Sequence, residues 1–425
     1  MKFLQHLVPA LLPAFLCTPS TALRIPKRPA TAHSSPAVAA PALAQQPIIH
    51  SPNDNDAAFP DVVTPALPRL VIYFQTTHDE GTKLPISMLP LITQKHIALT
   101  HLIVCTFHFH LDDYLHLNDL PVHHPAFYTL WNETSLVKAA GVKVMGMIGG
   151  AAPGAFTNYT LDGDGPTFWR YYTQLRAAIS FYELQGLDIN VEQPFSDEGI
   201  RRLIRQLRHD FGPGFVISLA PVAMALKGTR YAAFALNLSG FDYDDLEAEM
   251  GPWIDFYNAQ FYNGFGSMAS QVLFDRIVDN GYEPTRVVAG QITSRELGGG
   301  FVEHATLNET VVALRRKHGE IGGIMGWEYF NGHPGGTEEP WRWAQAMTAI
   351  LRPGLAPRLR MTPRTAGRLV QTLEHVAEAV AEGGGGEGQV GGLYGFRGYK
   401  YQVSSPPVRP IDYWGMVNEA DDEDD

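Results

Sequence analysis

Short apolar runs recur along the chain between Arg69 and Leu351, and amphipathic segments separate them. Each run is shorter than a typical helix, so the pattern indicates strands. The eight runs are Leu70–Gln75, Leu102–Phe107, Val142–Ile148, Gly186–Glu192, Phe215–Ala220, Ile254–Tyr262, Arg286–Gln291 and Gly322–Trp327. Few of them alternate strictly between apolar and polar residues, which is typical of parallel strands buried on both faces.

The amphipathic pattern of the intervening segments predicts helices. In the clearest one, Ile200, Leu203, Ile204 and Leu207 fall on one helical face. Eight strand–helix units in about 280 residues predict an α/β protein with a (β/α)8 TIM barrel. A doubly wound open sheet is the alternative, but the end of the first run, Tyr73–Thr77, lacks a glycine-rich phosphate loop.

The composition divides the chain into four parts. Residues 1–22 combine Lys2, an apolar stretch and small residues at 20–22, so we expect a signal peptide and a secreted, extracellular protein. Residues 23–67 are rich in Pro and Ala and predict a disordered linker. The barrel is expected over 68–351. The extension over 352–425 holds one expected helix, Thr362 to Ala381, and an acidic tail; a disordered tail is the simpler view of it, and we assign it no chemistry.

Charge narrows the classes of partner. The formal net charge is −12, which disfavours nucleic acid and anionic membranes, whereas a neutral sugar polymer remains compatible. After the N-terminal segment, no apolar run reaches the roughly 18 residues that a membrane span needs. Four Asn-X-Ser/Thr triplets fit a secreted glycoprotein; they begin at Asn132, Asn158, Asn237 and Asn308.

Cysteine and histidine indicate no metal site. A processed chain would keep only Cys105, which lies in an apolar run and is expected to be buried. The densest histidine clusters are His108-Phe-His110 and His123-His124. No third ligand with a familiar spacing follows them, so we predict solvated loop histidines, with no metal and no cofactor.

The run that begins at Gly186 carries the candidate chemistry. Side chains alternate along a strand, so Asp188, Asn190 and Glu192 share one face, toward the barrel interior. Buried carboxylates are costly without a function or partners, and a structural polar cluster is a comparable interpretation. We expect repulsion from Asp188, together with burial, to raise the pKa of Glu192 into the range of a general acid.

This segment resembles the signature D-G-x-D-x-D-x-E of glycoside hydrolase family 18, the chitinases, of the fungal and plant type. Gln185 stands at the first Asp, Asp188 at the second, Asn190 at the third and Glu192 at the Glu. The run Lys143–Gly150 resembles the third strand of the family, with Met147 in place of a serine.

Three further segments match the family in the expected order. Leu219-Ala-Pro221 resembles the fifth strand, and Gln260-Phe-Tyr-Asn263 resembles the sixth. Gly322–Trp327 resembles the eighth strand, whose Trp forms the floor of the sugar site. The correspondence covers about residues 69–351, and several weak motifs in the correct order are more specific together than any one alone.

The resemblance implies catalytic roles for four residues. Glu192 would protonate the glycosidic oxygen, while the 2-acetamido oxygen of the substrate attacks the anomeric carbon. Tyr262 would hydrogen-bond the acetamido group, and Asp188 would support the catalytic strand electrostatically. Asn190 could orient the acetamido group but carries no negative charge. Losing one such electrostatic contact typically costs about 10²–10³ in rate.

The resemblance also implies binding roles. Trp327 would stack beneath the sugar, Gln260 and Asn263 would flank it, and Tyr73 is expected among the binding residues. The first interpretation is a monomeric chitinase-like hydrolase of chitin or N-acetylglucosamine oligosaccharides. The second is an endo-β-N-acetylglucosaminidase that cuts the core of N-glycans. The third is a catalytically weak, chito-oligosaccharide-binding lectin, supported by Asn190 and opposed by Glu192.

Overall fold

The computed structural model describes residues 67–110, 112–228, 237–357 and 360–371. The expected signal peptide, nearly all of the expected linker and the acidic tail lie outside the described residues.

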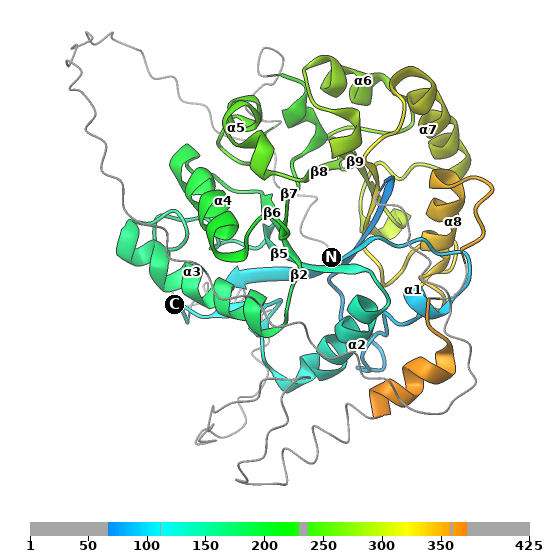
Figure 1. The fold of residues 1–425 in the computed structure, drawn as a ribbon, viewed down its shortest axis with the longest axis horizontal. Helices are drawn as coiled ribbons and strands as arrows, with labels where there is room; N and C mark the ends of the chain where they lie inside the picture. The colour runs from blue at the N-terminus through cyan, green and yellow to red at the C-terminus, as the bar shows by residue number, and fades with distance from the viewer. Residues whose placement is uncertain (1–66, 111, 229–236, 358–359, 372–425) are drawn as a thin grey trace, which may run out of the picture. The chain divides into compact units, whose positions relative to one another are not determined.

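Eight parallel strands form a closed barrel (Figure 1). They coincide with the eight predicted runs to within a few residues: β1 Arg69–Phe74, β2 His101–Phe109, β5 Lys143–Gly150, β6 Gly186–Val191, β7 Val216–Leu219, β8 Phe256–Gln260, β9 Val287–Ile292 and β10 Gly323–Trp327. The first strand closes the barrel, since β1 pairs with β2 on one side and with β10 on the other. The predicted TIM barrel is confirmed.

Helices surround the barrel on the outside (Figure 1). They are α1 Pro90–Thr93, α2 Tyr128–Ala139, α3 Gly165–Phe181, α4 Asp197–Phe211, α5 Tyr243–Met250, α6 Val272–Asp279, α7 His304–His318 and α8 Arg342–Leu351. Short 3₁₀ turns lie at Pro125–Phe127, Ala223–Leu226, Gly251–Trp253, Pro284–Arg286 and Arg295–Leu297.

Helix α4 shows how sequence sets these elements. Ser196 caps its first turn by accepting a hydrogen bond from the Gly199 amide, at 2.9 Å. The helix ends before Gly212, whose φ of 73° is unfavourable for other residues. The predicted apolar face is confirmed, because Ile200 and Leu203 are fully buried, as are its other two members.

Two short strands were not predicted. Strand β3 (Leu115–Leu117) pairs antiparallel with the end of β2, and β4 (Leu120–Pro121) pairs with β3. We call the part of β2 from Phe107 onward, β3 and the described residues between them the β2–β3 hairpin. Runs of three and two residues are too short to show a period, so the sequence gives no signal for them.

An apolar cluster fills the barrel interior. It includes Cys105, Met145, Val288 and Met325, each at most 1% exposed. The expected burial of Cys105 is confirmed.

The start of the C-terminal extension packs on the barrel. Arg352 donates to the Pro68 carbonyl at 2.8 Å, and Arg360 donates to the Leu99 carbonyl at 2.6 Å. Both carbonyls precede a barrel strand, so the contacts lie at the N-terminal end of the barrel. Residues 363–371 are helical, as expected, and the rest of the expected helix lies outside the described residues. The rest of the extension, residues 372–425, also lies outside the described residues.

Accessibility separates the four Asn-X-Ser/Thr triplets. Asn132 lies within α2 and is only 8% exposed, so its side chain is not accessible in the folded protein. Asn158 and Asn308 are exposed. Among the helices that the structure describes, none has the length and apolarity to cross a membrane.

Candidate functional site

Strand β6 divides its side chains as predicted. Leu187, Ile189 and Val191 are at most 2% exposed and alternate with the polar residues. Asp188 and Asn190 contact residues of other barrel strands across the interior. Glu192 follows Val191 directly and therefore lies at the C-terminal end of the barrel, where TIM barrels carry their chemistry.

Asp188 is the deepest acid of this strand, and three neutral groups donate to it. The Tyr73 hydroxyl donates to Oδ2 at 2.6 Å, and the Ser218 hydroxyl donates to Oδ1 at 2.6 Å. The Asn258 amide adds a third hydrogen bond, to Oδ1 at 3.0 Å. Burial raises the pKa of Asp188, although these hydrogen bonds favour the anion and lower it.

Gln260 fixes the orientation of two side-chain amides, its own and that of Asn190, between Asp188 and Glu192. Its Nε2 donates to the Ala220 carbonyl at 3.0 Å, and because a carbonyl only accepts, the orientation of the Gln260 amide is determined. The same Nε2 lies 3.3 Å from Asn190 Oδ1 and 3.1 Å from Glu192 Oε1. Asn190 is thereby turned so that its Nδ2 donates to Glu192 Oε1, at 3.0 Å.

Glu192 has one occupied and one available oxygen. The amides of Asn190 and Gln260 both donate to Oε1, while no described residue donates to Oε2. Burial raises the pKa of Glu192, and the two amide hydrogen bonds partly oppose this. The side chain is only partly buried, so the arrangement presents a carboxyl group with a raised pKa near an accessible surface, as a general acid requires.

The expected cause of this raised pKa was partly wrong. Burial contributes as predicted, but repulsion from Asp188 does not. Four residues along a strand separate the two acids by about 13 Å, and the neutral Asn190 lies between them. Like-charge repulsion falls with distance, so desolvation decides the pKa.

Aromatic residues form a wall at the same end of the barrel. Tyr262 is 5% exposed and belongs to the interior cluster with Tyr73, against which Trp327 packs. The rings of Tyr73 and Trp327 are 5.5 Å apart at their centroids. Burial, then the nearby Glu192 and Asp188, raise the pKa of Tyr262 well above its usual value, so its hydroxyl remains a donor.

The remaining predicted residues have structural contacts. Tyr73 is 1% exposed and its hydroxyl is committed to Asp188; a sugar contact for it stays a prediction. Asn263 Oδ1 accepts from the Gly299 amide at 2.9 Å, which ties Asn263 to the loop after β9. Gln185 Oε1 accepts from the Val144 amide at 3.1 Å, at the far end of β6 from Glu192. Met147 lies beside Asn190, whose Nδ2 is 3.7 Å from the sulfur.

Sequence reasoning missed Glu328. It follows Trp327 at the end of β10 and is 4% exposed. Its carboxylate accepts from the Thr76 amide at 2.7 Å and the Gln75 amide at 3.1 Å, so it joins the ends of β10 and β1. A charged residue just after a buried barrel strand is a signal that would have drawn attention to it.

The histidine prediction was only partly correct. His123 and His124 are exposed, as expected, but His108 lies within β2, and both His108 and His110 are half-buried. His116, which the prediction did not include, is 4% exposed on β3. Asp112 and His116 supply the further ligand atoms near His110 that the spacing argument did not find.

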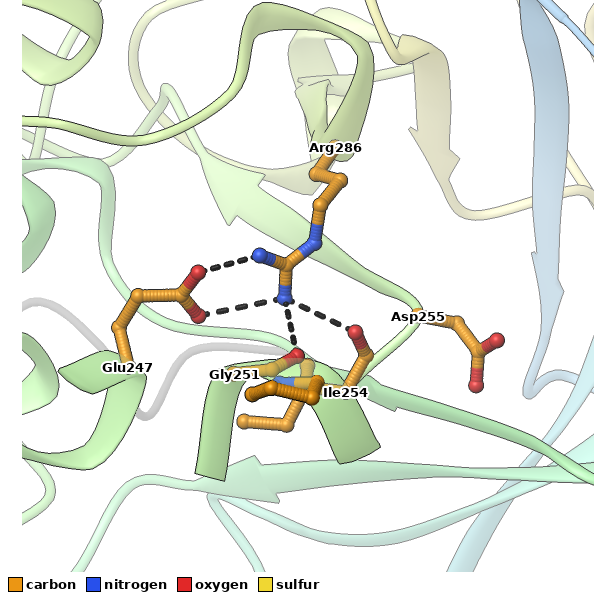
Figure 2. A pocket seen from close by; sticks show the side chains of 6 residues that line it. Glu247, Gly251, Ile254, Asp255 and Arg286 are labelled. Carbon is orange, nitrogen blue, oxygen red and sulfur yellow. Dashed lines mark hydrogen bonds and ion pairs between the residues drawn. The ribbon is translucent and has the colours of Figure 1, made fainter. Parts of the chain in front are cut away.

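A hollow at the opposite end of the barrel carries no comparable chemistry. Figure 2 shows Arg286 within it, donating to Glu247 and to the carbonyls of Gly251 and Ile254. These residues precede β8 and β9, so the hollow lies at the N-terminal end of the barrel, where TIM barrels do not place catalysis.

Comparison with known proteins identifies similar structures. No family model and no curated protein matches the chain. A fungal endo-beta-N-acetylglucosaminidase from glycosyl hydrolase family 18 is 60% identical, with a TM-score of 0.65, over 68% of this chain and 100% of its own. The chitinase ChiC from Aspergillus fumigatus is 42% identical, with a TM-score of 0.59, over 66% of this chain and 98% of its own. A family 18 chitinase from Pseudoalteromonas aurantia shares the fold at 18% identity and a TM-score of 0.52, over 67% of this chain and 100% of its own.

Proposed function

Because this chain belongs to glycosyl hydrolase family 18 and is thus a glycosidase, we propose that it hydrolyses the β-1,4 bond between two N-acetylglucosamine residues. The first candidate substrate is chitin or its oligosaccharides, and the proposed mechanism is substrate-assisted, with retention of configuration. The observation that carries the proposal is Glu192, a carboxyl group with a raised pKa and an oxygen free of donors among the described residues.

Glu192 supplies both proton transfers. Its Oε2 gives a proton to the glycosidic oxygen as the bond to the anomeric carbon breaks, and the substrate's acetamido oxygen bonds to that carbon. The carboxylate then takes a proton from the water that opens the oxazolinium ion, which restores the acid. The amides of Asn190 and Gln260 stay on Oε1 and stabilise the anion between the two steps.

The nucleophile comes from the substrate in this proposal. Asp188 is fully buried and its oxygens accept three hydrogen bonds, so it cannot reach a sugar in the mouth of the barrel. Tyr262 would hold the acetamido oxygen through its neutral hydroxyl, and Trp327 would stack under the ring. Asn190 would align the acetamido group without the charge that an aspartate brings to the cationic intermediate.

A second candidate is an endo-β-N-acetylglucosaminidase acting on N-glycans. The 60% identity to a fungal enzyme of that activity, over that enzyme's full length, favours it. The core of an N-glycan contains the same bond between two N-acetylglucosamine residues, so the residues around Glu192 serve both candidates. The chitinase ChiC, at 42% identity, supports the first candidate in the same way.

The test compares two substrates and two matched variants. Wild type, Glu192→Gln and Glu198→Gln are assayed on a fluorogenic chito-oligosaccharide and on a high-mannose glycopeptide. Glu198 is the control, because it lies on α4, in the same strand–helix unit, and its side chain is 75% exposed. We expect Glu192→Gln to lose hydrolysis and Glu198→Gln to keep it.

The substrate that is cleaved decides between the two candidates. Cleavage of the glycopeptide alone would replace the first candidate by the second. Binding of chito-oligosaccharide without cleavage of either substrate, in wild type and in Asn190→Asp, would contradict both and support the lectin interpretation.

A further inference from the structure

Three potential metal ligands converge on the β2–β3 hairpin, outside the residues that the proposed function uses. They are His110, Asp112 and His116, whose ligand atoms all lie within 4.8 Å of one another. Asp112 is central, with Oδ2 3.1 Å from His116 Nε2 and Oδ1 3.9 Å from His110 Nδ1. Among the described residues, this is the one group of three or more His, Cys, Asp or Glu side chains with such a geometry.

The strand pairing brings these residues together. His116 lies directly opposite His108 in the antiparallel pair of β2 and β3, so His110, two residues after His108, reaches the same region. The rings of His110 and His116 stack, with centroids 4.7 Å apart and an interplanar angle of 16°. The hairpin therefore brings the three residues of the sequence pattern His-x-Asp-x₃-His together in space.

The cluster is only partly hydrogen-bonded: Asp112 Oδ2 pairs with His116 Nε2 at 3.1 Å, and Asp112 Oδ1 accepts from the Tyr114 amide at 3.1 Å. His116 is 4% exposed, and its Nδ1 has no hydrogen-bond partner among the described residues. The Nδ1 of the adjacent His108 is likewise buried without a partner there. A metal ion on His116 Nε2 would leave these two nitrogens unchanged, so the site rests on the convergence of its three ligand atoms.

We propose that His110, Asp112 and His116 bind one divalent transition-metal ion, with Zn²⁺ as the best fit. Two imidazoles and a carboxylate are a common zinc ligand set, and water completes the tetrahedron. Ligand atoms about 2.0 Å from zinc lie about 3.3 Å from each other in a tetrahedron. The 3.1 Å contact between His116 Nε2 and Asp112 Oδ2 already matches this. The 3.9 Å contact of His110 runs to the other oxygen, Oδ1, so the His110 and Asp112 side chains must rotate to bring all three ligand atoms, now within 4.8 Å of one another, onto one ion. Ca²⁺ and Mg²⁺ prefer all-oxygen sites and fit poorly.

The bound metal would cross-link the hairpin at the C-terminal end of the barrel, the end that carries Glu192. Asn118, just after β3, donates through Nδ2 to the Gln75 carbonyl at 2.9 Å and accepts from the Thr106 amide at 3.1 Å. Gln75 in turn donates to Glu328, the residue after Trp327. The hairpin is thus joined to the end of β1, and a metal across it stabilises this end of the barrel.

The test measures Zn²⁺ binding by the full chain after removal of metal with a chelator. Calorimetric titration of wild type is expected to show one equivalent of Zn²⁺, and Zn²⁺ is expected to raise the melting temperature. Asp112→Asn should bind at least about tenfold more weakly, since even a group that only orients a ligand contributes about 10–100-fold. Its side chain is 46% exposed, so this variant is expected to fold. His116→Ala is the second variant.

His209→Gln provides the matched control. His209 also contacts an aspartate, Asp210, at 2.8 Å, but is 80% exposed and belongs to no such three-residue group. It should bind Zn²⁺ as wild type does, and neither Mg²⁺ nor Ca²⁺ should displace the zinc. The proposal would be overturned if wild type showed no stoichiometric binding of Zn²⁺. It would also be overturned if Asp112→Asn and His116→Ala bound Zn²⁺ as tightly as wild type does.

Discussion

The two ends of the barrel hold their carboxylates in different ways. At the C-terminal end, Glu192 and Asp188 are surrounded by amide and hydroxyl donors. At the N-terminal end, Glu247 pairs with Arg286, and Asp255 with Arg208 at 3.0 Å. One end therefore leaves its acids without a compensating cation, whereas the other neutralises them.

This difference separates a reactive carboxyl group from a structural one. A cationic partner favours the ionised form of a carboxyl group, whereas burial without a cation favours the protonated form even where neutral donors partly oppose it. Only the second arrangement can deliver a proton near neutral pH. The hollow shown in Figure 2 lies at the cation-paired end, so the partners of a carboxylate identify the catalytic end better than concavity does.

The strongest test of this contrast is Glu192→Gln. Its kcat should fall by about 10³ or more, because a general acid contributes about 10²–10⁴ and this residue serves both steps. The melting temperature should stay near that of wild type, since glutamine keeps the shape of the side chain. Single-turnover assays measure the loss of activity, and thermal denaturation measures the melting temperature. Retained activity would contradict the proposed role of Glu192.

Arg286→Met tests the opposite end. The guanidinium group bonds Glu247 and two backbone carbonyls, so its removal should lower the free energy of unfolding by about 3 kcal/mol. The kcat of the folded enzyme should not change. Urea denaturation gives the first quantity, with Arg342→Met as the control. Arg342 is 51% exposed at the start of α8 and pairs with Glu339, three residues before it, so its loss should cost less than about 1 kcal/mol.

Asn190→Asp should move the catalytic end closer to the family signature. A carboxylate at this position stabilises the cationic intermediate, so kcat/KM is expected to rise by about tenfold or more. The new charge would also lie beside Glu192 Oε1, now 3.0 Å from Asn190 Nδ2, and should raise the pKa of Glu192 further. The alkaline limb of the pH–rate profile should then move to higher pH; a fall in kcat/KM would show that Asn190 is adapted to its amide neighbours.

The smallest effect is expected from Gln260→Met. Its amide hydrogen bond lowers the pKa of Glu192 by favouring the anion, so losing it should raise that pKa. Because the acid must be protonated to act, the alkaline limb of the pH–rate profile should move to higher pH by less than about one unit. The pH dependence of kcat/KM measures this, and a shift to lower pH would contradict the assignment.

The sequence predicted the barrel and the inward face of β6 for a physical reason. Strand periodicity is local, so eight apolar runs and the inward face of Asp188 and Glu192 could be read from residue spacing. The partners of these acids could not, since Ser218 and Asn258 approach Asp188 from other strands. The pairing of His110 with His116 depends on a hairpin register that three residues of β3 do not encode by themselves.

The closure of the barrel has a consequence for its synthesis. Arg69 of β1 contacts Gly322, immediately before β10, across 253 residues of sequence. At about 5–20 residues per second, β1 leaves the ribosome roughly 13 to 51 s before the strand that covers its second edge. During that interval one edge of β1 has no native partner, and an open apolar edge is a site for mispairing. The first strand of the barrel therefore keeps one unpaired edge until its last strand has been made.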